Sequence, residues 1–211
     1  MDKRFMENLQ MNDFSIESLA VTAIVFISAY ILGSIPFGIL ISNVYGLGNL
    51  RKLGSGNIGA TNVLRTGNRL AALLTLILDA SKGLLGVILA RLISEDAAIV
   101  ASVCVITGHI YPIWLKFVGG KGVATFIGVL LALNFIAGIF VCLVWLSVAF
   151  FFRYSSLAAI ISSISAPIWI FLFYGNDALV VTLIMTILIL YRHKDNIKRL
   201  LDGSESKIGN Y

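Results

Sequence analysis

The chain has 211 residues, of which 58% are hydrophobic and 13% charged, and its mean hydropathy is +0.93. These values exclude an ordinary soluble domain and are typical of a polytopic membrane protein. The formal net charge of +5 does not indicate nucleic-acid binding, because the basic residues lie in short loops between apolar runs. Cys104 and Cys142 both fall inside apolar runs and show neither disulfide nor metal-site spacing.

The first apolar run begins near residue 19 and predicts a membrane span that stays in the mature protein. The first eighteen residues carry both charge signs, and the run is longer than the apolar core of a signal peptide. One helical crossing needs about 20 residues. The apolar runs cover residues 19–45, 70–93, 97–115, 123–152, 155–174 and 178–191.

The run over 123–152 is too long for one straight crossing. We expect it to break at Asn134, between Leu133 and Phe135, which gives a short helix followed by a longer one. The sequence therefore predicts an all-α integral membrane protein with about seven transmembrane helices. Six helices would place both termini on one side and remove the charge asymmetry between the two faces.

The charges of the loops predict the orientation. Seven helices place three loops and the C-terminal tail on one side, at residues 46–69, 116–122, 153–154 and 192–211. That side carries twelve Lys and Arg residues against three acids, and the opposite side carries three against seven. The positive-inside rule then predicts an N-terminus outside and a C-terminus in the cytoplasm. We expect a single domain over 1–211, with 1–16 extracytoplasmic and 192–211 a cytoplasmic tail.

The loop over 54–65 reads Gly-Ser-Gly-Asn-Ile-Gly-Ala-Thr-Asn-Val-Leu-Arg and is the most informative stretch. Glycines leave backbone N–H groups able to face an anion. Asn57, Thr61 and Asn62 add neutral donors, and Arg65 adds a planar fork that matches phosphate oxygens. Such a loop at a membrane surface predicts phosphate chemistry beside lipid.

A second glycine-rich segment, Gly-Gly-Lys-Gly-Val-Ala-Thr over 119–125, opens the fourth helix. Amides and the Lys121 ammonium would meet there at a positive helix terminus. This is not a Walker A loop, since Leu115 replaces its first glycine and Gly122 follows the lysine. The alternative is a close-packed helix start with a lysine that only sets orientation.

Three further features lie near the same face. His109 is an ionisable residue inside a span, which favours a functional role over simple packing. Ser155 follows a tight turn and could equally cap the next helix. His193 and Asn196 are three residues apart in the basic tail and would share a helix face, although such tails also bind anionic lipid headgroups.

Asp79 and Lys82 are three apart inside the second apolar run, and we interpret them as a structural ion pair. The cytoplasmic face has few carboxylates, so no metal or cofactor is expected. Ser55 lacks the Gly-x-Ser-x-Gly spacing of a hydrolase nucleophile, and neither histidine has an aspartate at the spacing used by many acyl-thioester-dependent acyltransferases. The residues favour a site that holds phosphates.

Four ordered motifs carry a resemblance to a known family. They are Gly-Ser-Ile-Pro-Phe-Gly over 33–38, the 54–65 loop, the 108–125 segment and the 193–207 tail. Together they resemble the bacterial acyl-phosphate:glycerol-3-phosphate acyltransferase family (PlsY type) over nearly the whole chain. The resemblance implies a seven-helix inner-membrane enzyme that transfers a fatty acyl group from acyl phosphate to position 1 of glycerol 3-phosphate. The products would be lysophosphatidic acid and inorganic phosphate, in the first step of phospholipid synthesis.

The resemblance also implies the site residues. Those expected to be catalytic are Ser55, Arg65, His109, Lys121, Ser155, His193 and Asn196. Those expected to bind the substrate phosphates are Gly54, Ser55, Gly56, Asn57, Asn62, Arg65, Gly120, Lys121 and Gly122. Acyl phosphate, glycerol 3-phosphate and membrane lipid are the expected partners. The alternative is a transporter for a phosphorylated metabolite, but its ionisable residues would spread along a path, often within inverted repeats, and the sequence shows no repeat.

Overall fold

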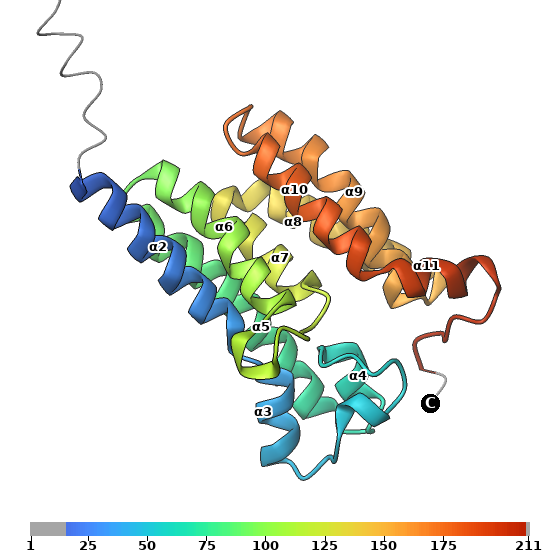
Figure 1. Ribbon diagram of the computed structural model, residues 1–211. Helices are drawn as coiled ribbons and strands as arrows, with labels where there is room; N and C mark the ends of the chain where they lie inside the picture. The colour runs from blue at the N-terminus through green and yellow to red at the C-terminus, as the bar shows by residue number, and fades with distance from the viewer. Residues whose placement is uncertain (1–15, 210–211) are drawn as a thin grey trace, which may run out of the picture.

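The computed structural model describes residues 16–209, and all regular structure in that range is helical (Figure 1). Most of the predicted extracytoplasmic segment at 1–16 lies outside the described residues. The elements in chain order are α2 (Ile16–Ser34), α3 (Phe37–Val44), η1 (Leu50–Lys52), α4 (Ala60–Leu64), α5 (Arg69–Arg91), α6 (Glu95–Ile110), η2 (Ile113–Leu115), α7 (Val123–Leu133), α8 (Phe135–Phe152), α9 (Ser155–Phe173), α10 (Leu179–Arg192) and α11 (Lys194–Leu201).

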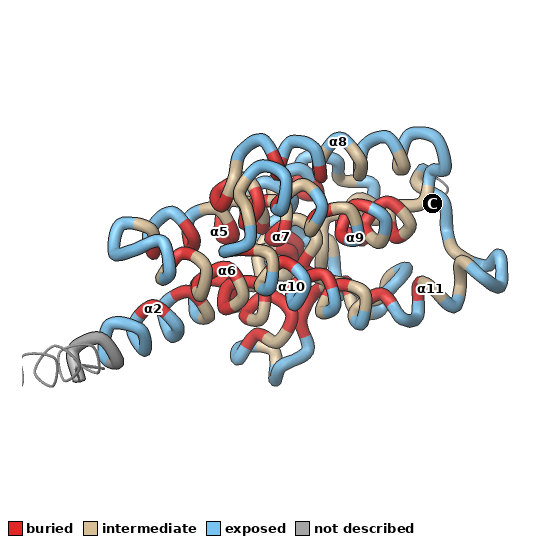
Figure 2. The backbone as a smooth tube through the Cα atoms, turned by 90° about the horizontal axis from the view of Figure 1, so that it is seen from above, coloured by how far each residue is buried: buried red, intermediate tan, exposed pale blue. Residues whose placement is uncertain are grey.

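The apolar helices form one bundle whose outer faces carry large exposed apolar side chains. Five segments are long and apolar enough to cross a membrane: Ala20–Val44, Arg69–Arg91, Glu95–Leu115, Phe135–Phe152 and Ser155–Phe173. The helices α7 and α10 are apolar but shorter. This is the fold of an all-α integral membrane protein. Buried residues concentrate on α6 and on parts of α5, α7 and α10, and the outer helices of the bundle are largely exposed (Figure 2).

The first apolar run is interrupted, which its hydropathy did not indicate. Helix α2 ends at Ser34 and α3 begins at Phe37, on either side of Pro36, which has no N–H and clashes with a preceding helical turn. The carbonyl of Ile35 at this break accepts a hydrogen bond from Lys82 Nζ at 2.7 Å. A buried cation of α5 thus satisfies a backbone group that the break leaves outside the helical pattern.

Small residues let the helices approach closely. A Cβ on Gly33 of α2 would lie 2.1 Å from the carbonyl oxygen of Val105, and one on Gly108 of α6 would lie 2.2 Å from that of Tyr30. The two glycines therefore admit each other's helix backbone. Close α2–α6 packing fixes the C-terminal end of α6, where His109 lies.

Asn134 divides the 123–152 run as predicted, with extended backbone angles of φ −148° and ψ 115°. Its Oδ1 accepts from the N–H of Ala137 at 3.0 Å, which caps α8, and its Nδ2 donates to the carbonyl of Phe173 at 2.9 Å. We expect Asn134→Ala to lower the free energy of unfolding by about 1–2 kcal/mol, as the loss of a helix cap does. Asn134→Ser keeps a cap acceptor and should cost less. Thermal unfolding of both variants in detergent tests the difference, and equal losses would contradict it.

The polar segments gather at one end of the bundle. Helix α4 and the loop before it, the start of α7, the start of α9, and α11 with its following tail all lie there (Figure 1). The predicted site motifs come from these segments.

Candidate active site

A cavity of about 590 Å³ opens between α4, α5, α7, α8 and α9 and is closed on one side by the C-terminal tail. It brings together every residue that the sequence predicts to be catalytic: Ser55, Arg65, His109, Lys121, Ser155, His193 and Asn196. Asn57, Asn62 and Gly122 line it as well. Gly54, Gly56 and Gly120 are not among the described residues that line it.

Asn62 holds the shape of the 54–65 loop. Its Nδ2 donates to three backbone carbonyls, those of Leu50 at 3.0 Å, Leu53 at 3.1 Å and Asn57 at 2.8 Å. Its Oδ1 accepts from the Ser55 N–H at 3.2 Å. The side chain is 1% exposed, so its donors already have backbone partners. Asn62 therefore shapes the loop from within, and Gly54 and Gly56 make its turns at positive φ.

A second cluster connects the start of α7 to the tail. Lys121 Nζ donates to Asn196 Oδ1 at 2.6 Å, and Asn196 Nδ2 donates to Glu205 Oε1 at 2.7 Å. Glu205 also accepts from Ser156 Oγ at 2.7 Å and from Arg199 Nε at 2.6 Å. In the described part of the tail, Glu205 is the one carboxylate that lines the cavity. It thus orients the Asn196 amide that accepts from Lys121.

The environment of this cluster changes the acidity of two groups. Burial lowers the pKa of Lys121 to about 8, although the Glu205 carboxylate acts in the opposite direction. Burial, and next the positive charge of Lys121, lowers the pKa of His193 to about 4. His193 is therefore neutral near pH 7. Its Nδ1 lies 2.8 Å from the carbonyl of Ile189, which only accepts, so Nδ1 carries the proton and Nε2 keeps a lone pair.

His109 lies at the inner end of the cavity beside the predicted ion pair. Lys82 Nζ is 2.7 Å from Asp79 Oδ1, which confirms that pair, and His109 Nδ1 is 3.5 Å from the same oxygen. All three side chains are almost fully buried. His109 thus connects this ion pair to the segment that carries Lys121, because its ring lies beside Asp79 and its carbonyl accepts from the Gly120 N–H.

The backbone N–H groups of the segment before Lys121 are less available to a ligand than its glycines suggest. The N–H of Gly119 donates to the carbonyl of Ile110 at 3.0 Å, and that of Gly120 to the carbonyl of His109 at 3.1 Å. These two amides hold the segment on the end of α6. A Cβ on Gly120 would lie 2.1 Å from His109 Nε2, so the imidazole edge packs directly on this glycine.

We expect Gly120→Ala to lower kcat/KM by about 10²-fold, because the added methyl group displaces either the His109 ring or the Lys121 backbone by roughly 1 Å. Steady-state kinetics on the purified variant, with its melting temperature measured in parallel, checks this result. Wild-type kinetics would contradict the packing described here.

Ser155 opens α9, but Tyr154 occupies the cap position. Instead of capping, the Ser155 hydroxyl lies 3.0 Å from Thr61 Oγ1 of α4. Arg65 Nη2 donates to Ser206 Oγ of the tail. A hollow of about 520 Å³ adjoins the cavity, and Ser55, Arg65, Glu205 and Ser206 line both.

Sequence reasoning did not assign Ser156, Glu205 or Ser206 to the site, although all three line the cavity. It also missed that Thr61 is the partner of Ser155. Glu205 had one available signal, because it is an acid within a tail rich in Lys and Arg. The serines had none, since isolated serines are common at helix starts.

The chain is similar to known proteins over most of its length. The family model described as glycerol-3-phosphate acyltransferase matches residues 23–203. The glycerol-3-phosphate acyltransferase of Dinoroseobacter shibae is 52% identical over 188 residues, which cover 89% of this chain and 93% of the relative. That of Roseobacter denitrificans is 50% identical over 94% of this chain and 98% of the relative.

A solved structure has the same fold. The crystal structure of PlsY (YgiH), an integral membrane glycerol 3-phosphate acyltransferase, in its glycerol 3-phosphate form, superposes with a TM-score of 0.85 at 38% identity. The match covers 89% of this chain and 96% of that one. Its lysophosphatidic acid form gives a TM-score of 0.83. By family model, sequence identity and fold, the chain belongs to the glycerol-3-phosphate acyltransferase family.

Proposed function

We propose that this protein transfers a fatty acyl group from acyl phosphate to the 1-position of glycerol 3-phosphate, giving lysophosphatidic acid and inorganic phosphate. The observation that carries the proposal is a single cavity that joins a cationic, amide-rich end to an apolar arm. Two substrates that bring phosphate groups and one that brings a hydrocarbon tail need both parts. Relatives with this name are about 50% identical over most of the chain.

At the polar end, Arg65 and Lys121 come from two different segments and face the same space. They would orient the two phosphates and offset the repulsion between them. Gly122, at the N-cap position of α7, and Val123 and Ala124 of its first turn line the same space and add the positive end of a helix.

The apolar arm is lined by Leu73, Leu76, Ile77, Ile127, Trp145 and Leu146 of α5, α7 and α8. Leu73 is 51% exposed and Leu146 is 51% exposed on the outer face of the bundle, so the arm opens toward lipid. Each buried methylene stabilises a bound acyl chain by about 0.8 kcal/mol. The donor would enter and the product leave laterally.

The chemistry is a direct acyl transfer in a ternary complex. The 1-hydroxyl oxygen of glycerol 3-phosphate bonds to the acyl carbonyl carbon, and the bond from that carbon to the donor's phosphate oxygen breaks. Phosphate leaves with the electron pair. The hydroxyl proton goes to His193 Nε2, to His109 or to a substrate phosphate. Donors such as Ser55, Asn57 or Asn196 would stabilise the oxyanion, and the loss of one such donor costs about 10²–10³ in rate. An acylated Ser55 or Ser155 trapped from donor alone would contradict direct transfer.

We further propose the placement in the membrane: seven transmembrane helices, with α7 and α10 as the two short ones, in the bacterial inner membrane. The N-terminus would lie outside, and the site and the tail in the cytoplasm. The charge bias of the loops supports this placement. A single-cysteine labelling series at both ends of the bundle tests it.

The function is tested with purified protein in detergent or lipid mesophase. Glycerol 3-phosphate is supplied with either palmitoyl phosphate or palmitoyl-CoA, and phosphate and lysophosphatidate are followed. We expect equal release of both products from the acyl phosphate only. No turnover with either donor, in a preparation shown to be folded, would contradict the proposal and favour transport.

A further inference from the structure

Two arginines outside the cavity converge on the backbone that precedes Lys121. Arg51, in η1, donates from Nη2 to the carbonyl of Val118 and from Nη1 to that of Gly119 at 3.5 Å. Arg192, at the end of α10, donates from Nη2 to the carbonyl of Gly119 at 3.4 Å and from Nε to that of Gly120 at 3.3 Å. Both guanidinium groups therefore bond the same carbonyl.

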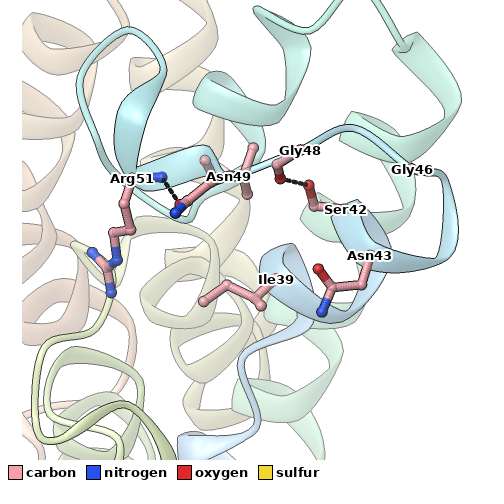
Figure 3. A pocket seen from close by; sticks show the side chains of 8 residues that line it. Ile39, Ser42, Asn43, Gly46, Gly48, Asn49 and Arg51 are labelled. Carbon is pink, nitrogen blue, oxygen red and sulfur yellow. Dashed lines mark hydrogen bonds between the residues drawn. The ribbon is translucent and has the colours of Figure 1, made fainter.

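Each arginine also belongs to a different site segment. Arg51 Nη1 lies 3.4 Å from the carbonyl of Gly56, inside the 54–65 loop. Its backbone N–H is fixed by Asn49 Oδ1 at 2.9 Å, and the side chain extends outward from this anchored loop (Figure 3). Arg192 directly precedes His193, and its guanidinium lies 5.8 Å from the centre of the Tyr111 ring. Arg51 thus joins the 54–65 loop to the segment before Lys121, and Arg192 joins the start of the C-terminal tail to the same segment.

The other sides of the 118–120 segment are occupied too. The N–H groups of Gly119 and Gly120 bond to the end of α6, and neither residue has room for a Cβ on the side of His109. The arginines hold the three carbonyls of the segment, and α6 holds the N–H groups of Gly119 and Gly120, so the segment is fixed in place. Lys121 follows it immediately, so that position sets where the lysine backbone starts.

We propose that Arg51 and Arg192 are positioning residues, which hold the carbonyls of residues 118–120 and thereby place Lys121 over the cavity. The inference rests on the proposed function only for its kinetic test. Neither arginine is among the described residues that line the cavity, so neither contacts a substrate bound there. Each guanidinium presents several N–H donors in a rigid planar fork, which matches two neighbouring carbonyls at once. A lysine ammonium is a compact charge on a flexible stem and does not reproduce this geometry.

The first test compares Arg51→Lys and Arg192→Lys with their alanine counterparts. We expect each lysine variant to lose about 10- to 100-fold in kcat/KM, close to its alanine variant, because the charge remains but the fork is lost. Lys52→Ala and Lys194→Ala are matched controls: both side chains are exposed in the same segments, and both variants should keep wild-type rates. Wild-type rates in the two lysine variants would overturn the proposal.

A second readout separates positioning from simple loss of stability. Burial is the main reason that the pKa of Lys121 is near 8; the Glu205 carboxylate raises it, and the charges of Arg199, Arg65 and Arg192 lower it. Arg51→Lys leaves these four charges unchanged, so a loosened segment that exposes Lys121 should move the alkaline limb of kcat/KM toward higher pH. The double variant should lose less than the product of the two single losses, since both arginines hold the same carbonyl. An unmoved limb together with multiplicative losses would overturn the proposal.

The proposed function can fail separately. If the wild type shows no turnover, its thermal stabilisation by glycerol 3-phosphate or inorganic phosphate is measured instead. The stabilisation should weaken in both lysine variants and persist in Lys52→Ala. Equal stabilisation of all four proteins would overturn the positioning role.

Discussion

Replacing Lys121 by alanine is expected to lower kcat/KM by about 10³-fold. The Lys121 ammonium bonds Asn196 Oδ1 of the C-terminal tail at 2.6 Å. The Lys121 backbone is held by the preceding glycines, whose N–H groups bond the end of α6. Removal of the ammonium deletes a cation that faces the substrate phosphates, and it leaves the Asn196 oxygen in a buried site without its donor. Each loss alone costs about 10- to 10³-fold in such sites.

The pH dependence identifies the group. With a pKa of about 8 for Lys121, the protonated fraction of the free enzyme falls above pH 8, and kcat/KM for glycerol 3-phosphate should fall with it. Lys121→Arg keeps its charge at every accessible pH, so its residual activity should lack this alkaline limb.

Lys116→Asn is the matched control for Lys121→Ala. Lys116 is an exposed lysine of the same loop at a positive φ of 52°, which asparagine tolerates. We expect its kinetics to match the wild type. A Lys121→Ala variant within tenfold of the wild type would contradict a direct role in phosphate binding.

The sequence predicted the bundle because the membrane imposes a simple rule on it. Each crossing needs a long apolar run, and each run ends in residues that stay in water, so hydropathy shows where helices lie. Asn134 was predictable as a break because it is a polar residue within a run too long for one crossing. The break at Pro36 was not inferred, because the residues on both sides of it are apolar.

The site was predictable at the level of which residues meet, and less so at the level of what each does. Motif composition pointed to Arg65 and Lys121, and the family resemblance added Ser55; all three line the cavity. Composition does not show which amide hydrogens are already bonded. Gly119 and Gly120 look free in sequence, yet both donate to the end of α6. Asn62 looks like a ligand, yet its side chain bonds the loop that carries it. Such contacts depend on segments far apart in the chain.

Glu205→Gln is expected to lower kcat/KM by about 10²-fold, because the carboxylate positions Asn196 and through it Lys121. Oε1 accepts from Ser156 and Asn196, and Oε2 accepts from Arg199. Glutamine offers an acceptor on one side only. Its NH₂ would face either the Asn196 amide or the Arg199 guanidinium, donor against donor. Glu205→Ala removes both acceptors and should lose more.

Stability against pH gives the same carboxylate a second signature. Burial alone would raise the pKa of Glu205, but the hydrogen bonds from Ser156, Arg199 and Asn196 outweigh it and hold the pKa below its ordinary value of 4.5. A depressed carboxyl pKa contributes stability that is present above the unfolded-state pKa and is lost as pH falls through the folded-state value. The wild type should therefore lose melting temperature below about pH 4.5, and Glu205→Gln should lack this part of the loss.

Asp202→Asn separates this effect from a general change in tail charge. Asp202 is exposed at the end of α11, three residues before Glu205, and its replacement removes the same charge from the same tail. We expect wild-type kinetics and the wild-type acid transition for Asp202→Asn. If both variants reduce activity equally, the tail acts through its net charge. If only Glu205→Gln does, the carboxylate acts through its own contacts, because it bonds the same Asn196 amide that bonds Lys121.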